Sequence, residues 1–509
     1  MEKQLLTSRL VKHLGLRSKQ FQYKTLVSHF RGIHSDQKSG NSYRLGVGEK
    51  GKDPGQLVEH VIRCALREVV LDHGPKDRQL DELHEVLRKL RTGAAGPEAI
   101  APKQWALLKT HGILHDSRLY DIGFWNLLSY YLSGDAFLFV HDVLGYETIV
   151  DNWNAAEAIP WFLRDFTESS FHTIEQGGME ALPRMLFAQF LEQYPSPHPK
   201  HDFLLSITQE KDEARLFTLK FENREENVLA RHVILAIPKE PLKRLFRPDV
   251  SLQSGLGAHD QITALNLAFD SVKAQPLFKL FLAYERAWWE DPRALGRDSG
   301  RAITDMPIRQ IYYFEPDASQ RGMVMASYSD SHYVDFWKAL QRRKLEPPFD
   351  PLELLQHGEL DEPEETVFHR FGANERMVRK AHRQIKQLHP EMAGADSIPE
   401  PYLGLAKEWS SDDPVDGALI GGGWHTWVVH AKSWEVMNTM KRPLNSNLYI
   451  CGEAYSSEQG WIEGALRSAE MALKEIGVPE PDDWIPRTDY RDYGNFEGHD
   501  EYIGWSPEK

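Results

Sequence analysis

Lys279 stands inside an otherwise apolar segment, FKLFLAY (278–284), which has the composition of a buried β-strand. An ammonium group is costly to bury unless it has a charged partner or a chemical task. Lys279 is therefore a candidate for binding or catalysis. A lysine at the end of a sheet, with its amine in solvent, is the structural alternative.

A second candidate site lies in LYICGEAYSSEQGWIEGALRSAEMAL (448–473), which begins with an apolar run typical of a strand. A helical pattern starts at Trp461. Its apolar stripe consists of Ile462, Ala465, Leu466, Ala469 and Leu473. The unpaired N–H groups at a helix start can bind an anion or a carbonyl oxygen, and Gly460 leaves room for a flat ligand. An ordinary strand–loop–helix crossover fits the same pattern.

Two tryptophans could line such a site. Trp424 lies in GGGWHTW (421–427), where the glycines would let the backbone approach a planar ring, and Trp461 follows Gly460. Each could form an aromatic wall beside a substrate, and each could equally belong to the core. His425 is expected to be a hydrogen-bonded structural residue rather than a base.

The stretch GEAYSSEQGWIEGALRSAE (452–470) closely resembles the C-terminal flavin-binding segment of the flavin-containing amine oxidase family, in its L-amino-acid oxidase branch. This motif is long and specific. Four other segments extend the resemblance along the chain: GGMEALP (177–183), HVILAIPKEPLKRL (232–245), FKLFLAYERAWWED (278–291) and ITDMPIRQIYYF (303–314). The resemblance implies FAD as the cofactor.

The resemblance also implies which residues bind that cofactor. In the family the C-terminal segment cradles FAD, and the helix start faces the pyrimidine end of the flavin. GGM stands where the family chain returns to the flavin domain, although a glycine turn before a helix explains it as well. The implied cofactor-binding residues are Gly178, Met179, Gly452, Glu453, Gly460, Trp461 and Ile462. GGGWHTW contains no cysteine, so nothing indicates the cysteinyl-flavin link of monoamine oxidases, and FAD is expected to be non-covalent.

Three residues match substrate-side positions of the family. Lys279 matches a lysine that holds a water near flavin N5, and would position water or oxygen as the reduced flavin is reoxidised. Tyr328 falls where L-amino-acid oxidases place a hydroxyl on the substrate carboxylate; a tyrosine at the rim of the core is the alternative. Asp330 stands at a side-chain pocket position that is usually apolar. A carboxylate there would favour a lysine or arginine substrate, unless Asp330 is a loop residue facing water.

The implied reaction is oxidative deamination of an L-amino acid. Hydride passes from the α-carbon to the flavin, the imino acid hydrolyses to a 2-oxo acid and ammonia, and oxygen becomes hydrogen peroxide. The expected catalytic residues are Lys279, Tyr328, Trp424 and Trp461, with Asp330 and Gly460 in the substrate pocket. Two alternatives stay open: an amino-acid 2-monooxygenase that yields an amide, and a non-catalytic scaffold subunit that keeps the fold.

The N-terminal unit of the family is absent from this sequence. Family members begin with a βαβ unit bearing GxGxxG and then supply a substrate-binding arginine, whereas residues 1–30 here resemble the segment that comes after that arginine. The chain is therefore expected to hold FAD weakly or not at all by itself. A partner subunit, a missing piece of chain or loss of catalysis would each explain this. We favour a partner protein that supplies the unit, or a missing piece, because Lys279, Tyr328 and GEAYSSEQGW are all retained; a homo-oligomer is the other expected assembly.

Composition excludes several classes of protein. The net charge of −15 argues against nucleic-acid binding, and two cysteines, Cys64 and Cys451, exclude a disulfide framework and a cysteine-based zinc site. No metal is expected. No apolar run approaches the roughly 20 residues that span a bilayer, and the first residues lack the apolar core of a secretory signal. A cytoplasmic protein without a membrane partner is expected, with an organelle transit peptide as the alternative.

These motifs need an α+β fold to position them. We predict an α/β flavin-binding domain, incomplete at its N-terminus, together with a mixed sheet-and-helix substrate domain and a helical module. The order is a helical module 1–170, flavin domain 171–250, substrate domain 251–415, flavin domain again 416–480 and an extended tail 481–509. Expected strands are 204–209, 215–222, 232–237, 262–269, 278–284, 310–314 and 323–328. Expected helices are 5–14, 54–69, 81–91, 102–109, 123–132, 156–166, 184–193, 334–342, 350–356, 376–387 and one from 461.

Overall fold

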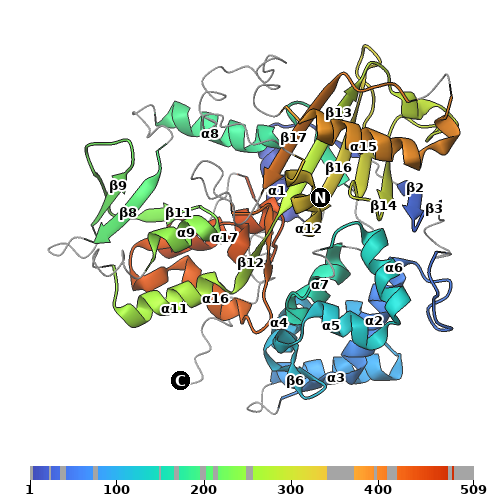
Figure 1. Cartoon of the computed structure of the whole chain (residues 1–509). Helices are drawn as coiled ribbons and strands as arrows, with labels where there is room; N and C mark the ends of the chain where they lie inside the picture. Colours follow the sequence, from blue (N-terminus) through green and yellow to red (C-terminus); the bar gives the residue numbers. More distant parts are fainter. Residues whose placement is uncertain are drawn as a thin grey trace.

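Helices and mixed sheets form three parts that meet in the middle of the molecule (Figure 1). We call them the helical module, the substrate sheet and the α/β part. The computed structural model describes residues 4–21, 25–34, 42–72, 78–147, 151–165, 171–194, 202–209, 216–247, 256–340, 372–394, 398–409, 421–479 and 484–485. The predicted helix 350–356 and most of the predicted tail lie outside these residues. The predicted α+β fold is confirmed.

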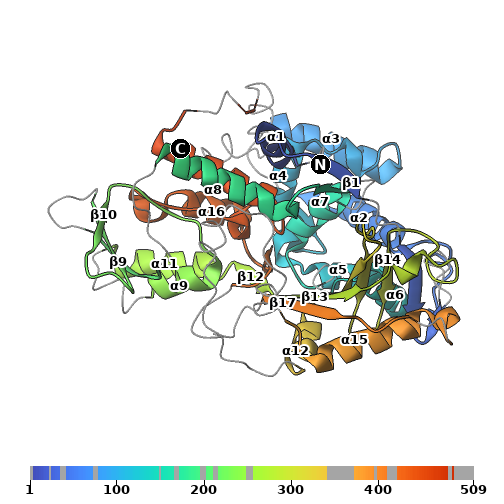
Figure 2. The same ribbon diagram turned by 90° about the horizontal axis from the view of Figure 1, so that it is seen from above.

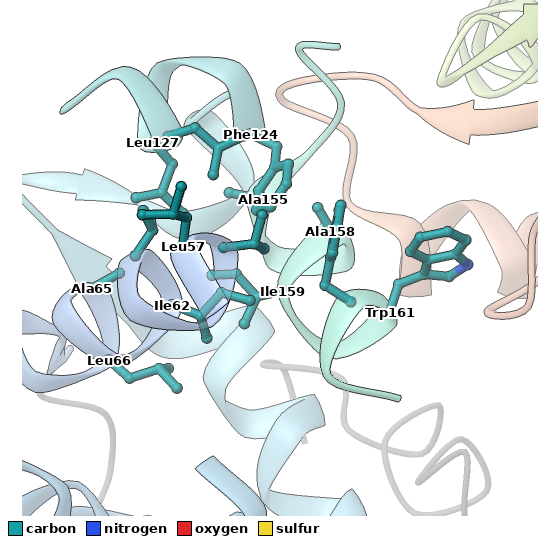
Figure 3. Close-up of a cluster of buried hydrophobic side chains, with 14 of the residues drawn as sticks. Leu57, Ile62, Ala65, Leu66, Phe124, Leu127, Ala155, Ala158, Ile159 and Trp161 are labelled. Atoms are coloured by element: carbon teal, nitrogen blue, oxygen red, sulfur yellow. The ribbon is translucent and has the colours of Figure 1, made fainter. Parts of the chain in front are cut away.

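The helical module is a bundle around one apolar core. Asp53 caps its first helix by accepting the Gln56 N–H, while the Gln56 side chain accepts the Asp53 N–H, as expected for Asp-Pro at a helix start. Figure 3 shows part of the core, with Trp161 extending away from the other labelled side chains. The helices are α2 (Pro54–Glu68), α3 (Arg78–Thr92), α4 (Pro102–His111), α5 (Phe124–Tyr131), α6 (Gly134–Leu144) and α7 (Ala155–Asp165).

Five of these helices agree with the predicted ranges, and α6 was not predicted. Its sequence, GDAFLFVHDVL, is apolar almost all round and begins with glycine, so it shows no amphipathic stripe. The Ser133 hydroxyl accepts the Ala136 N–H and starts the helix. The short strands β4 (Val70–Leu71), β5 (Gly112–Leu114) and β6 (Ser117–Arg118) form a small sheet at the end of the module.

The substrate sheet has seven strands. Five of them come from the predicted substrate domain, and the other two, β2 and β3, come from the chain before α2. In spatial order they are β17 (Leu403–Trp409), β13 (Leu277–Tyr284), β16 (Gly322–Asp330), β15 (Gln310–Tyr313), β14 (Gly300–Thr304), β2 (Thr25–Phe30) and β3 (Ile33–His34). Strands β2 and β3 lie within the range expected to be helical; β2 pairs parallel to β14 and extends the sheet.

The two faces of the substrate sheet differ in character. One face carries Phe278, Leu280 and Leu282, which are buried beneath α12 (His332–Lys338) and α15 (Glu375–Leu388). Alternation along β13 therefore turns Lys279 to the opposite face. Figure 2 shows α12 and α15 along one side of β13 and β17, with the helical module along the other. We call the face that carries Lys279 the open face of the sheet.

The α/β part is built on the parallel pair β11 (Val233–Leu235) and β19 (Leu448–Ile450), and two further strands, β12 (Val272–Gln275) and β18 (Trp424–Trp427), connect it to the substrate sheet. A three-stranded meander, β8 (Leu204–Gln209), β9 (Phe217–Phe221) and β10 (Val228–Ala230), lies beside it, and β1 (Ser18–Phe21) pairs with β7 (Phe171–Ile174). The helices are α1 (Leu5–His13), α8 (Ala181–Gln193), α9 (Lys239–Leu245), α11 (His259–Phe269), α16 (Ser433–Lys441) and α17 (Ile462–Ile476).

One predicted element is wrong. The range 262–269 was expected to be a strand and is the helix α11. Its buried residues, Ile262, Leu265 and Phe269, follow helical spacing, and the Gln261 side chain accepts the Ala258 N–H at the start of the helix. The capping contact and the helical spacing of the buried residues are both consistent with the observed helix.

The buried face of α17 is also unexpected. Glu463, Gly464, Arg467, Ser468 and Ala472 are buried, whereas the apolar stripe predicted for this helix is only partly covered. The helix therefore turns a charged face inward.

In the part of the chain that the structure describes, no helix is long and apolar enough to cross a bilayer.

Candidate functional site

Lys279 and Tyr328 lie opposite each other on the open face of the substrate sheet. They are direct partners in the antiparallel pair of β13 and β16. The Lys279 Nζ lies 4.8 Å from the centre of the Tyr328 ring and 5.8 Å from that of Trp409. Burial lowers the pKa of Lys279, and no carboxylate among the described residues pairs with it. Among the residues that the structure describes, its ammonium is thus held by aromatic faces, at modest strength.

The ring of Tyr146, from the segment after α6, packs against the ring of Tyr328. The two rings are nearly perpendicular, at 88°, with centres 5.2 Å apart. Burial raises the pKa of Tyr328 to about 12, so the phenol stays protonated and can donate a hydrogen bond. Tyr146 was not predicted, because a Gly-Tyr pair after an apolar helix carries no local signal of function.

A cluster of tryptophans lies on the side of the α/β part. The Trp424 ring centre is 6.5 Å from that of Trp161, with an angle of 26°, and 6.4 Å from that of Trp153. Gly460 has a φ of 84°, and a Cβ there would lie 3.0 Å from the Trp424 ring. Glycine is therefore needed both for the turn and for the close approach of the ring. Trp153 and Trp161 come from the helical module and were not predicted.

Glu453 holds the loop before α17 in place. Its carboxylate accepts the Gly460 N–H at 2.8 Å and contacts His425 Nδ1 at 2.5 Å. His425 is buried, and its Nε2 has no hydrogen-bond partner among the residues described. A buried ring nitrogen without a partner is costly, so this atom marks a place where a ligand group or water is expected.

Matches with known proteins agree with this arrangement. The family model described as flavin-containing amine oxidoreductase matches residues 9–476. The chain belongs to this family. It is 27% identical to Aplysianin-A of Aplysia kurodai over 380 residues, which is 70% of this chain and 61% of that protein. It is 21% identical to an L-amino-acid oxidase of Daboia russelii over 59% of this chain and 48% of that protein.

A solved putrescine oxidase has the same fold. It matches 94% of this chain and 86% of its own, with a TM-score of 0.56 and 12% identity. The chain spans 61% and 56% of the length of Aplysianin-A and of Achacin from Lissachatina fulica. The predicted family and its cofactor, FAD, are thus confirmed, and the relatives include L-amino-acid oxidases.

The residues of this amine oxidoreductase fit a flavin. Gly460 leaves a flat, side-chain-free surface beside Trp424, and His425 Nε2 offers a buried polar atom. The Trp461 side chain, at the N-cap, does not cap α17, and a helix N-terminus is a place where a carbonyl oxygen can bind. A Cβ on Gly452 or Gly178 would meet no atom within 4 Å. Met179, which follows Gly178, and Ile462, two residues after Gly460, are exposed.

The placement of Asp330 contradicts one of its two interpretations, and its place in the substrate pocket stays a prediction. The side chain is fully buried, so it is not a loop aspartate facing water. Its Oδ1 accepts the Glu147 N–H at 3.0 Å, which ties the helical module to β16. A carboxylate used in this way does not support the selection of a cationic substrate.

Among the described residues, no group of side chains that could hold a metal ion comes together.

A network of ionisable side chains borders the site. His141 donates to Asp142 at 2.9 Å and to Glu147 at 3.1 Å, and His332 contacts Glu147 at 2.5 Å. Burial opposes the charge of His141, but these hydrogen bonds outweigh burial and the nearby Arg309, and they raise the pKa of His141 from 6.5 to about 8. The imidazolium is therefore favoured in the folded protein.

This network predicts a pH-dependent stability. Because the folded-state pKa of His141 is raised, its contribution is complete below pH 6.5 and is lost as pH rises through about 8. The loss should be about 2 kcal/mol of unfolding free energy. Urea unfolding across this range would measure it. The His141→Gln variant should show a flatter profile, and an equally steep one would contradict the assignment.

Proposed function

We propose that this chain is the catalytic and substrate-binding part of an FAD-dependent L-amino-acid oxidase. The pairing of Lys279 with Tyr328 on the open face is the observation that carries the proposal. Strand β13 continues from β12, whose partner β18 begins at Trp424, so strand pairing links Lys279 and Tyr328 to the wall at Gly460. L-amino-acid oxidases among the relatives support the same reaction.

FAD bound to the chain would supply the acceptor for a hydride from the substrate α-carbon. The residues that would hold it are Gly178, Met179, Gly452, Glu453, Gly460, Trp461 and Ile462. Tyr328 would donate its hydroxyl proton to the substrate carboxylate, because its raised pKa keeps it protonated. Lys279 would hold a water or oxygen molecule with its ammonium group.

The aromatic side chains would exclude water from this space. Trp424 lies against Gly460 and is backed by Trp153 and Trp161, so the wall is rigid and apolar. A dry wall strengthens the hydrogen bond from Tyr328 to a carboxylate. No general base is required of the chain if the substrate amine is neutral when it reacts.

We further propose that a βαβ dinucleotide-binding unit, from a partner or from a longer form of the chain, completes the cofactor site. Leu186 and Phe190 on α8 and Tyr194 at its C-cap recur at every fourth residue and are 39%, 47% and 58% exposed. Ile234, in the middle of β11, is 45% exposed. Apolar side chains gathered on one helix face and one sheet face favour a covering element over bare solvent.

An absorbance spectrum in the visible range tests the proposal. The purified chain is mixed with FAD, alone and with a βαβ unit expressed as a separate chain, and an L-amino acid is then added without oxygen. We expect a protein-bound flavin spectrum that bleaches with the amino acid, and stronger binding when the unit is present. A 2-oxo acid among the products identifies the oxidase, whereas an amide identifies the 2-monooxygenase. If neither mixture retains flavin, the enzyme proposal fails and a scaffold role leads.

A further inference from the structure

Two lysines lie side by side on the open face of the substrate sheet. Lys279 of β13 and Lys407 of β17 are direct partners in the antiparallel pair of these strands. The next residue, Glu408, pairs with Lys338 of α12 at 3.4 Å, on the helix-covered side of the sheet. Alternation along β17 therefore places Lys407 on the open face, beside Lys279.

Both ammonium groups lie near one aromatic ring. The Lys279 Nζ is 5.8 Å and the Lys407 Nζ is 6.0 Å from the centre of the Trp409 ring. Like charges directly opposite each other destabilise a sheet, and the attraction between a cation and a ring is modest. Lysine can serve on an edge strand to prevent sheet association, but Lys407 is only partly exposed and lies over Trp409. The arrangement therefore favours a bound anion that is shared by the two cations.

The side chains around this lysine pair form an accessible part of the open face. Lys279, Lys407, Trp409 and Tyr328 are each partly exposed, whereas the residues that alternate with Lys279 on β13 are buried beneath α12 and α15. The chain as a whole has a net charge of −15, which repels anions. A local pair of positive charges is therefore expected where an anionic ligand has to be held.

We propose that this lysine pair selects a dicarboxylic L-amino acid, such as L-glutamate, as the substrate. Tyr328 binds the α-carboxylate, as in the proposed function, and Lys407 binds the side-chain carboxylate. Charge-assisted hydrogen bonds of this kind are about twice as strong as neutral ones. The same two cations repel a basic amino acid or a diamine. This inference rests on the proposed function and names its substrate class.

The spacing of the strands fits a substrate of this length. Tyr328 pairs with Lys279 on one side, and Lys407 pairs with Lys279 on the other. Adjacent strands are about 4.8 Å apart, so Tyr328 and Lys407 belong to strands about 10 Å apart. Side chains stand roughly perpendicular to a sheet, so the ends of these two are separated by a similar distance. L-Glutamate, with a hydrogen bond at each carboxylate, is also about 10 Å long.

A comparison of substrates tests the inference. The unaltered full chain is used, loaded with FAD and with the βαβ unit where FAD binding requires it. L-Glutamine is the matched substrate, since it has nearly the shape of L-glutamate and no side-chain charge. We expect kcat/KM to be at least about tenfold higher for L-glutamate than for L-glutamine or L-lysine. Equal values for L-glutamate and L-glutamine would overturn the inference.

Two substitutions of Lys407 sharpen this comparison. In Lys407→Met, the ratio of kcat/KM for L-glutamate to that for L-glutamine should fall about tenfold. Lys407→Glu should reverse the charge preference, so that L-lysine becomes a better substrate than L-glutamate. Lys338→Met is the control, because Lys338 pairs with Glu408 on the helix-covered side, and it should keep the ratio of the unaltered chain. An unchanged ratio in Lys407→Met would contradict the role of Lys407.

A binding measurement separates this inference from the proposed function. The probes are glutarate, a dicarboxylate without an amine, and its monoamide, each titrated by calorimetry. The unaltered chain should bind glutarate at least about tenfold more tightly than the monoamide, and Lys407→Met should lose this preference. A preference that survives in Lys407→Met would overturn the inference. If Lys407→Met does not fold, the comparison of the two probes on the unaltered chain decides.

The two proposals fail in different ways. A chain that prefers glutarate but oxidises no L-amino acid would refute the proposed function and retain the anion subsite at Lys407. A chain that oxidises neutral L-amino acids and does not prefer glutarate to its monoamide would retain the proposed function and refute the dicarboxylic substrate.

Discussion

The Arg467→Met variant is expected to lose about 3–5 kcal/mol of unfolding free energy, because it removes the cation from a buried set of charges. Arg467 Nη1 lies 2.9 Å from Glu458 and its Nε lies 3.8 Å from Glu463. All three side chains are less than a tenth exposed. Methionine fills a similar volume but leaves two buried carboxylates without the guanidinium.

The Arg467→Met substitution should also destabilise α1, near the other end of the chain. Glu463 accepts the N–H groups of Leu6 and Thr7 and the hydroxyl of Thr7, so it caps α1 from the first turn of α17. A misplaced Glu463 would therefore loosen α1 and the start of α17 together. We expect FAD binding to weaken in the same variant, since the start of α17 is part of the proposed cofactor site.

Urea unfolding of matched variants would measure this effect. Arg88→Met is the control, because Arg88 and Glu85 form an exposed pair at 2.8 Å whose removal should leave stability nearly unchanged. Arg467→Lys should recover part of the loss, since it restores a positive charge without the forked geometry. Equal losses in Arg467→Met and Arg88→Met would show that the buried charges are not coupled.

This charged face of α17 marks a limit of sequence reasoning. The helix itself was predicted correctly from its spacing, but periodicity points to the apolar stripe as the buried one. The structure instead buries Glu463 and Arg467, because α1 and the loop before α17 supply partners for them. Such partners are 456 residues away in sequence or in an irregular loop. Neither is visible in a local pattern.

Only some residues of the candidate site were singled out from the sequence. Lys279 was recognised because a charge inside an apolar strand breaks a local rule, and Tyr328 because a long family resemblance covers it. Tyr146, Trp153 and Trp161 were missed. They belong to the helical module and reach the site only through tertiary packing. Tyr146 and Trp153 lie in connections between helices and Trp161 lies within α7, so their sequence neighbourhoods carry no signal of a site.

The substitution Lys279→Met is expected to raise stability and to lower activity. The Lys279 ammonium is partly buried against Tyr328 and Trp409, and burial lowers its pKa. Methionine has a similar length and no charge to desolvate, so the free energy of unfolding should rise by about 1 kcal/mol. If the ammonium holds water or oxygen for the reaction, turnover should fall about 100-fold, as for removal of one preorganised donor.

The opposite signs distinguish a functional lysine from a structural one. A lysine kept for packing or for an ion pair would lower stability when it is replaced, and activity would fall only as far as the fold does. Lys273→Met is the control, because Lys273 is exposed on β12 and pairs with Asp151 at 2.6 Å. The Lys273→Met substitution should change neither the free energy of unfolding nor the turnover appreciably. Urea unfolding and oxygen consumption with an L-amino acid measure the two effects. A Lys279→Met protein that is less stable but fully active would exclude Lys279 from the chemistry.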